Sequence, residues 1–258
     1  CQGFHKNPRQ SAQSASSALP SSSRPTRIVI ELNLFTMKNF NTPLKAMLAA
    51  VMICTALFVQ AQPVPEVWAE GFVGLNGITL DGDGNLWVAE AGSGNNDSKV
   101  SVVTPDKVTH PVVINLPSYF DTLTGDAPGA WRAYRLGNQL HVVVGGHLRP
   151  GAGSLYTFDL TSWLPGDPAL TLANAIGGTD VQAFALTEGF VESDIYRAAW
   201  DDAGNAYIAD AAANAIIKRN ASTGALSVLH EFPPFLNVYT PFPPFIDYVP
   251  TGIIRNPA

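Results

Sequence analysis

The stretch "TLDGDGNLWVAEAG" places acidic and amide side chains at the alternating positions that a calcium loop uses. Asp81, Asp83 and Asn85 would be its first three ligands. The pattern fails at the sixth position, where Leu86 replaces the glycine of the sharp turn, and at the twelfth, where Gly92 replaces the bidentate glutamate. Because Gly, Asn and Asp also suit the positive φ of tight hairpins, we predict a hairpin turn here and not a calcium site.

A second group of candidate residues is basic and lies in stretches typical of loops. His147 and Arg149 stand in "GGHLRPG", and Arg197 follows Tyr196 near a predicted strand. Imidazole and guanidinium groups supply N–H donors, and the guanidinium also stacks on aromatic rings. These residues therefore predict a pocket for an anionic or aromatic ligand, with ordinary surface residues as the alternative.

Several kinds of chemistry have no support in the sequence. There is no G-x-S-x-G elbow, no pair of histidines at metal-ligand spacing and no phosphate-binding loop. The 15 Lys and Arg residues are outnumbered by 21 Asp and Glu, which gives a net charge of −6 without any basic cluster. A nucleic-acid partner is excluded because it needs a basic surface.

The calcium-like stretch recurs as "AWDDAGNAYIADAA", 120 residues further along the chain. In this alignment Asp81 corresponds to Asp201 and Glu90 corresponds to Asp210. A weaker copy between them, "YRLGNQLHVVVGG", has Val144 where the others have an acid. We infer an internal structural repeat.

Each copy predicts four antiparallel strands, the first two joined by the Gly/Asn/Asp turn. The outer strands are predicted as 99–104 with 108–114 in the first copy, "GSLYTFDL" with "ALTLANAI" in the middle copy, and 215–220 with 226–232 in the third. Four-stranded units that recur every 40–65 residues or so are typical of β-propeller blades.

The second strand of each copy is nearly all apolar, in "LWVAEA", "LHVVVG" and "AYIADA". A strand buried on both faces requires this pattern, and a blade stacked between two others would provide it. The 22 Gly, the 20 Pro and a charged fraction of only 14% also favour many short strands joined by turns. We therefore predict an all-β protein, with a β-propeller favoured over a β-sandwich.

In a propeller of this kind the connections sort to two rims. The turns within each hairpin, such as "DGDGN", "PDK", "LGNQ", "DDAGN" and "ASTG", would be short and lie at one rim, the short-turn rim. The opposite, long-loop rim would hold "AGSGNNDS", "GGHLRPGAG", "LPSYFDTLTGDAPGAW", "GGTDVQAFALTEGFVESDI" and "PPFLNVYTPFPPFIDYVP". Binding residues favour loops on rigid scaffolds, so we expect a ligand, a small molecule or a protein, at the long-loop rim.

The chain is expected to have three parts. Residues 1–36 are Ser-rich without apolar periodicity and read as disordered or non-native. Residues 37–61 begin with Met, carry two lysines before a 14-residue apolar run and end in "VQA", which predicts a secretory signal peptide and no stable membrane insertion after cleavage. Residues 62–258 would then be a cysteine-free exported domain, secreted or periplasmic.

The stretches "GITLDGDGNLWVAEAG", "SLYTFDL", "NAYIADAAANAIIKRNASTGALSVLHEF" and "FPPFLNVYTPFPPFIDYVPTGI" resemble the ScyD/ScyE family. This resemblance covers residues 64 to about 254 and implies an exported, NHL-type propeller of six blades. Only three blades, with "VPTGIIRNPA" as the start of a fourth, are visible here, so a chain truncated relative to such a ring is expected. The family's link to the pigment scytonemin implies a role beside a small-molecule pathway.

The resemblance leaves two functions open. The first is a binding or scaffold module without catalysis, without a metal or cofactor, whose ligand-binding candidates are Glu90, Asp210, His147, Arg149 and Arg197. The second, suggested by the related lactonase propellers (gluconolactonases and regucalcin), is a hydrolase in which Glu90 or Asp210 holds calcium or another divalent metal that polarises a lactone. The structural alternative for both acids is that they accept hydrogen bonds from the following loop, with Asn95 or Asn214 as donors. Catalysis stays uncertain, with a non-enzymatic role preferred.

Overall fold

The computed structural model describes residues 47, 65–122, 125–146, 149–239 and 243–256. The chain divides into two units, Cys1–Val64 and Pro65–Ala258, and the strands found among the described residues lie in the second. The predicted upstream segment and signal peptide lie outside the described residues, apart from Met47.

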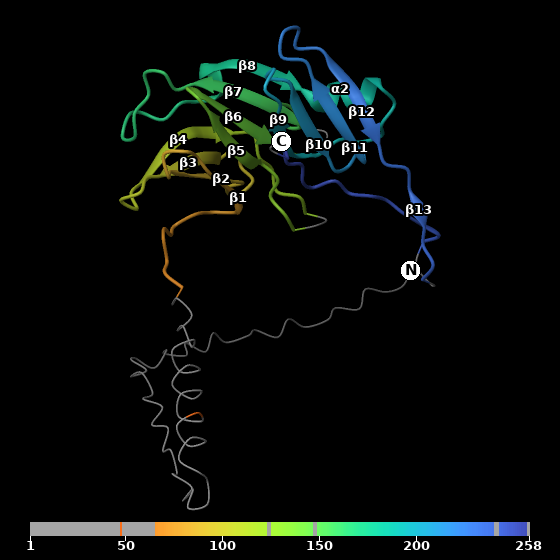
Figure 1. Ribbon diagram of the computed structural model, residues 1–258, viewed down its shortest axis with the longest axis horizontal. Helices are drawn as coiled ribbons and strands as arrows, with labels where there is room; N and C mark the ends of the chain where they lie inside the picture. The colour runs from red at the N-terminus through yellow and green to blue at the C-terminus, as the bar shows by residue number, and fades with distance from the viewer. Residues whose placement is uncertain (1–46, 48–64, 123–124, 147–148, 240–242, 257–258) are drawn as a thin grey trace, which may run out of the picture. The chain divides into compact units, whose positions relative to one another are not determined.

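This unit contains three four-stranded sheets, each an antiparallel meander in chain order (Figure 1). The first sheet comprises β1 (Leu75–Leu80), β2 (Leu86–Glu90), β3 (Ser98–Val103) and β4 (Thr109–Leu116). The second comprises β5 (Ala130–Leu136), β6 (Gln139–Val144), β7 (Ser154–Asp159) and β8 (Ala175–Asp180). The third comprises β9 (Ile195–Trp200), β10 (Ala206–Asp210), β11 (Ala215–Arg219) and β12 (Leu226–Glu231). A two-stranded hairpin follows, formed by β13 (Phe235–Leu236) and β14 (Phe245–Ile246).

The repeated turn is a hairpin, as predicted. Between β1 and β2, Asp81 accepts hydrogen bonds from the backbone N–H of Asn85 at 2.9 Å and from the indole N–H of Trp87 at 2.9 Å. Burial opposes ionisation, but these hydrogen bonds outweigh it and lower the pKa of Asp81 to about 2. Asp201 repeats the arrangement between β9 and β10 with the backbone N–H of Asn205 at 2.9 Å. The acids of this stretch therefore hold a turn together.

Two connections around the second sheet differ from the prediction. The fourth strand is β8 and not "ALTLANAI", because residues 160–174 form a long link that ends in a short 3-10 helix, η1 (Leu172–Asn174). Within this link Leu170 pairs with β4, donating its N–H to the carbonyl of Val112 at 2.8 Å. The prediction of uniformly short connections at the short-turn rim is therefore wrong for the second sheet.

The link between the second and third sheets also holds a helix that the sequence did not predict. Helix α2 (Val181–Thr187) begins where the Asp180 carboxylate accepts the N–H of Ala183 at 2.8 Å, an N-cap contact. Val181 and Ala185 point from α2 into the space between the two sheets, where they join the buried side chains of β9 and β10. The helix therefore fills part of the gap between the second and third sheets.

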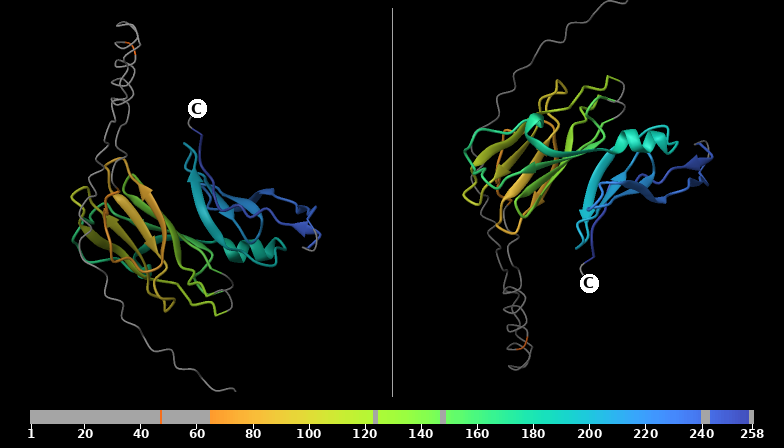
Figure 2. Two further views of the ribbon diagram at one scale, coloured as in Figure 1. Left: turned by 90° about the horizontal axis from the view of Figure 1, so that it is seen from below. Right: turned by 90° about the horizontal axis from the view of Figure 1, so that it is seen from above.

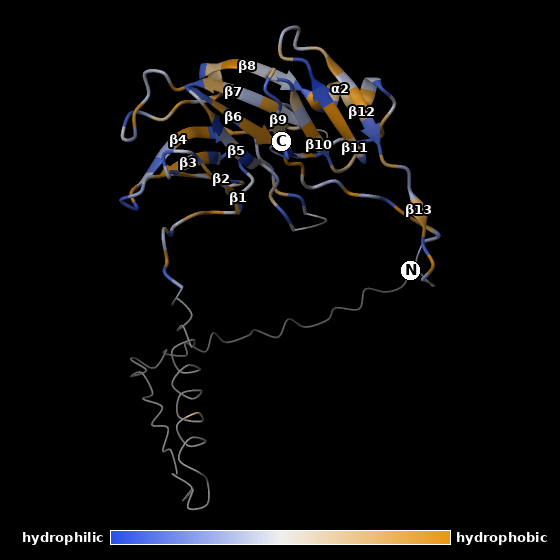
Figure 3. Cartoon of the chain, in the orientation of Figure 1, coloured by the Kyte–Doolittle hydropathy of each residue, from blue (hydrophilic) through white to orange (hydrophobic). Residues whose placement is uncertain are grey.

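Neighbouring sheets meet face to face in chain order (Figure 2). One buried cluster joins the first sheet to the second, with Trp87, Val100, Leu140 and Phe158 among its members. A second cluster joins the second sheet to the third. Strand β6 contributes to both and is apolar along much of its length (Figure 3), which agrees with the prediction that the second strand is buried on both faces.

The first two sheets approach each other closely at Gly77 of β1. A methyl group there would lie 1.8 Å from Arg132 Nη1 and 2.2 Å from the backbone carbonyl oxygen of Trp131. Because a backbone atom of β5 cannot move aside, we expect Gly77→Ala to lower the free energy of unfolding by about 2 kcal/mol, a typical cost of overpacking. Urea unfolding measures this loss. Gly82→Ala is the control, since no atom lies within 4 Å of the added group, and equal stability of the two variants would contradict the close contact.

Candidate functional site

Glu90 ends β2 and is fully buried. Its carboxylate accepts the backbone N–H of Val73 at 2.8 Å and the hydroxyl of Ser101 at 3.2 Å, and Lys99 Nζ lies 3.3 Å away. Val73 precedes β1, so Glu90 ties the entry of the first sheet to its two central strands. The side chain therefore has partners for both oxygen atoms.

Asp210 occupies the same position at the end of β10 and is also fully buried. It accepts the hydroxyl of Ser193 at 2.5 Å, the backbone N–H of Asp194 at 2.8 Å and the backbone N–H of Ala213 at 3.1 Å. Burial raises the pKa of Asp210, against the effect of these hydrogen bonds. The carboxylate holds the segment before β9 against the turn after β10.

Both acids thus accept hydrogen bonds from neighbouring segments, but their partners are not Asn95 and Asn214. One donor to Glu90, Val73, and two donors to Asp210, Ser193 and Asp194, come from the segment that precedes the first strand of the sheet. A signal for these segments was present in the sequence, because "EGFV" occurs at 70–73 and again at 188–191, shortly before the first strand of each sheet.

The structure does not bring Glu90 and Asp210 together. They belong to the first and third sheets, with the second sheet between them, and the second sheet has Val144 at the same position. Within the described parts of the chain, no group of three or more His, Cys, Asp or Glu side chains is arranged to hold a metal ion.

Arg149 lies at the long-loop rim, as predicted. Its guanidinium carbon is 4.8 Å from the centre of the Tyr119 ring, and the two residues line a hollow of about 420 Å³ with Asn95, Asn96 and Ser118. His147, the other residue predicted here, lies outside the described residues. Arg149 and Tyr119 offer a cation and an aromatic face to this hollow.

Arg197 lies elsewhere, on β9, the edge strand of the third sheet. Its register position matches that of Arg132 on β5, since Arg197 pairs with Ala209 and Arg132 with Val143. Burial, and then the charge of Arg197, lower the pKa of Arg132. Arg132 was not among the predicted site residues, but the strand register places it on β5 at the position that Arg197 holds on the contacting strand β9.

The Arg132 guanidinium is held in place by the first sheet. Its Nη1 atom donates to the backbone carbonyl of Asn76 at 2.8 Å, and Asn76 Nδ2 donates back to the carbonyl of Ala130 at 3.1 Å. Among the described residues, neither Arg132 nor Arg197 has a carboxylate within ion-pair distance. Arg132 and Arg197 therefore hold matching positions on two contacting strands, and neither has a described acid to neutralise its charge.

Aromatic residues connect the same two strands. Trp131 stacks on Tyr196, with ring centres 4.5 Å apart and planes 18° apart. Tyr134 accepts the backbone N–H of Ala198 at 3.4 Å, and burial raises its pKa. A signal for this cluster was present in the sequence, because the aromatic–arginine pair at 131–132 recurs at 196–197.

The comparisons with known proteins leave the family open. No family model matches the chain, and no curated protein matches it significantly. A solved structure described as a structural genomics protein of unknown function from Bacteroides thetaiotaomicron VPI-5482 is similar, with a TM-score of 0.41 and 13% sequence identity. The match covers 62% of this chain and 32% of that chain, and likeness at this level does not bear on function.

The described residues were also compared with the requirements of a membrane span. None of the helices in this part of the chain is both long enough and apolar enough to cross a membrane.

Proposed function

We propose that the three sheets are blades of an NHL-type β-propeller and that the protein is an exported binding module, related to the ScyD/ScyE family. Two features support a propeller over a sandwich. Each sheet has the same meander order, with its first strand at an edge, and the sheets stack one after another along the chain. A sandwich places its strands in two sheets, whereas blades repeat as units with contacts only to their neighbours.

In such a propeller β1, β5 and β9 are the innermost strands and border the central axis. The observation that carries the function is the Arg132–Arg197 pair on two successive innermost strands. Bringing two positive charges together in a half-buried place is unfavourable unless an anion accompanies them. We infer that the pair binds a negatively charged group of a small molecule.

The position of the pair agrees with a ligand that enters from the long-loop rim. Both arginines lie near the beginning of their strands, and the beginning of each strand follows a long connection. Arg149 and Tyr119 lie at the same rim, where they offer a further cation and ring. Export rests on the predicted signal peptide, and a role beside a small-molecule pathway rests on the family resemblance.

Phosphate titration tests the anion site. We expect inorganic phosphate to bind the protein, and Arg132→Gln or Arg197→Gln to weaken this binding at least tenfold, because a hydrogen bond to a charged group contributes about 1.5–3 kcal/mol. Isothermal titration calorimetry at low ionic strength measures the affinity.

Arg135→Gln is the matched control for this experiment. Arg135 lies on the same strand, but its guanidinium already faces Asp81 at 3.4 Å and Asp83 at 3.2 Å. Its replacement should leave phosphate binding unchanged. Equal affinities in all three variants and the unmodified protein would reject the site.

A further inference from the structure

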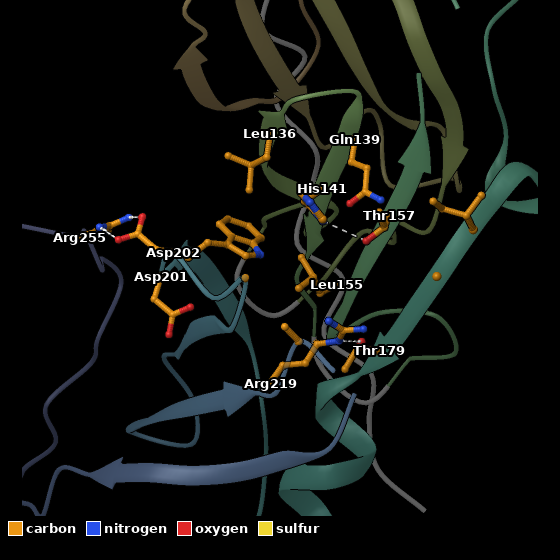
Figure 4. A pocket seen from close by; sticks show the side chains of 15 residues that line it. Leu136, Gln139, His141, Leu155, Thr157, Thr179, Asp201, Asp202, Arg219 and Arg255 are labelled. Atoms are coloured by element: carbon orange, nitrogen blue, oxygen red, sulfur yellow. Dashed lines mark hydrogen bonds and ion pairs between the residues drawn. The ribbon is translucent and has the colours of Figure 1, made fainter. Parts of the chain in front are cut away.

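A hollow of about 620 Å³ lies between the second and third sheets, at the short-turn rim (Figure 4). The second sheet contributes His141, Thr157 and Leu155, and the third contributes Trp200 and Arg219. The sequence analysis assigned this rim to short turns and expected no ligand there. The volume is within the range of sites for small molecules, which is about 300–1,000 Å³.

The hollow exists because the gap between these sheets is filled only at one end. The sheets touch where β5 and β6 of the second sheet meet β9 of the third, and helix α2 packs Val181 and Ala185 into the gap near the long-loop rim. At the short-turn rim, none of the helices in the described part of the chain enters the gap. The corresponding gap between the first and second sheets is different, since the 160–174 link places Leu170 and Leu172 against the buried cluster there.

Gly177 on β8 helps to keep the hollow open. It pairs with Thr157, which in turn pairs with His141, so the three residues form one row across the second sheet. A methyl group added at Gly177 would meet only Thr157 Cβ, at 3.8 Å, and the backbone φ there is not in the left-handed region. Glycine has no side chain to pack and therefore weakens a strand. At position 177 it leaves open a space that a side chain would otherwise occupy.

The walls of the hollow combine an aromatic face with a positive charge. The His141 and Trp200 rings are 4.9 Å apart, and His141 Nδ1 lies 3.0 Å from the Thr157 hydroxyl oxygen. Arg219 Nε donates to Thr179 Oγ1 at 2.9 Å, which fixes the guanidinium on the opposite wall. Burial, and then the charge of Arg219, lower the pKa of His141 to about 4, so the imidazole is neutral near pH 7.

The acids that border the hollow are engaged elsewhere. Asp201 accepts hydrogen bonds from Asn205 and Tyr207, and Asp202 pairs with Arg255 at 2.5 Å. Among the described residues, no carboxylate lies within ion-pair distance of Arg219. A single unpaired positive charge matches a ligand with a single negative charge, and a guanidinium fits the planar fork of a carboxylate.

We propose that this hollow is a second ligand site, specific for a small aromatic carboxylate whose ring lies against Trp200 and whose carboxylate binds Arg219. It is independent of the Arg132–Arg197 site, which has different residues at the inner edge of the sheets. The apolar side chains of Leu155 and Ile176 complete the wall against the ring.

Binding of 2-naphthoate, compared with its neutral isostere 2-naphthamide, tests this proposal by isothermal titration calorimetry. We expect the protein to bind 2-naphthoate saturably and at least tenfold more tightly than 2-naphthamide. Arg219→Gln should weaken 2-naphthoate binding at least tenfold and leave 2-naphthamide binding unchanged. Gly177→Leu should abolish binding of both, because the leucine side chain fills the hollow.

Each variant has a matched control. Lys218→Gln removes the same charge on the opposite face of β11, where Lys218 lies 5.5 Å from the Tyr207 ring centre. Gly82→Leu adds the same side chain in open space in the β1–β2 turn. Arg132→Gln should also leave 2-naphthoate binding unchanged, so this site and the anion site can fail separately.

Two results would overturn the proposal. One is the absence of 2-naphthoate binding to the unmodified protein, and the other is unchanged affinity in both Arg219→Gln and Gly177→Leu. Circular dichroism of each variant verifies that it is folded before the titration.

Discussion

Replacement of Glu90 by alanine is expected to lower the free energy of unfolding by about 3 kcal/mol, because it removes a fully buried hydrogen-bonded carboxylate. The Val73 N–H and the buried Ser101 hydroxyl would lose their acceptor, and Lys99 would lose its nearest opposite charge. A cavity is left beside both central strands of the first sheet. Equilibrium unfolding in urea, followed by circular dichroism, measures the change.

Glu90→Gln separates the structural role of this residue from the metal-binding alternative. A glutamine side chain can still accept the Val73 N–H, so we expect it to recover most of the lost stability. If Glu90 instead held a catalytic metal, Glu90→Gln would abolish metal binding and lactone hydrolysis while changing stability little. Glu70→Ala, at an exposed position before β1, controls for the loss of one negative charge. A Glu90→Ala variant as stable as the Glu70→Ala variant would contradict the structural role.

Those elements that repeat in the sequence could be predicted from it. The Asp–Gly–Asn turns have a local cause, since the side chain of Asp81 or Asp201 bonds to groups within six residues. The apolar second strands follow from burial on both faces. Four-stranded antiparallel sheets were therefore predictable from turn chemistry and hydropathy alone.

The connections that differ between copies were not predictable in the same way. The 160–174 link is long because Leu170 pairs with β4 of the preceding sheet, a contact between residues far apart in sequence. Helix α2 has a short apolar pattern in a segment that also reads as a loop, and its N-cap at Asp180 lies inside a predicted loop. The 160–174 link and helix α2 both depend on the gaps between neighbouring sheets. A pattern of residues close together in sequence does not reveal these gaps.

The binding residues also fall into those that the sequence could indicate and those that depend on contacts between sheets. Arg149 and Arg197 could be singled out by residue type. The position on β5 that matches Arg197 is held by Arg132, which the recurring aromatic–arginine pair hints at and the strand register identifies. The hollow beside Arg219 depends on the absence of a side chain at Gly177 and on the end of the gap that α2 leaves open. A glycine in a strand does not by itself predict a ligand site, because the open space beside it depends on the position of the facing sheet.

Acidification is expected to destabilise the protein between pH 6.5 and pH 4 through His141. The pKa of His141 is about 4 in the folded protein and 6.5 in an unfolded chain, so the folded state favours the neutral imidazole. The contribution of the neutral imidazole to the free energy of unfolding is present in full above pH 6.5 and is lost as the pH falls toward 4. The shift corresponds to at most about 3 kcal/mol, at 1.36 kcal/mol for each pKa unit. Urea unfolding at pH 7, 6, 5 and 4 measures the slope.

The neighbours of His141 explain why the loss falls in this window. Thr157, Trp200 and Arg219 surround the imidazole, and none of them supplies a negative charge that would stabilise the protonated form. Asp81 and Asp97, with pKa values of about 2, contribute stability that is lost only between pH 3.8 and 2. The pKa of Asp210 is raised in the folded protein, so protonation of this carboxylate favours the folded state as the pH falls. This effect offsets part of the loss of stability that His141 causes.

His141→Gln should therefore flatten the stability profile between pH 6.5 and 4, because glutamine can still bond to Thr157 but does not titrate. His230→Gln, at an exposed position on β12, should leave the slope unchanged. An aromatic carboxylate in the hollow would place a negative charge near His141 and raise its pKa, so saturating 2-naphthoate should reduce the slope in the unmodified protein. An identical slope in the His141→Gln variant would mean that this imidazole does not govern the pH dependence.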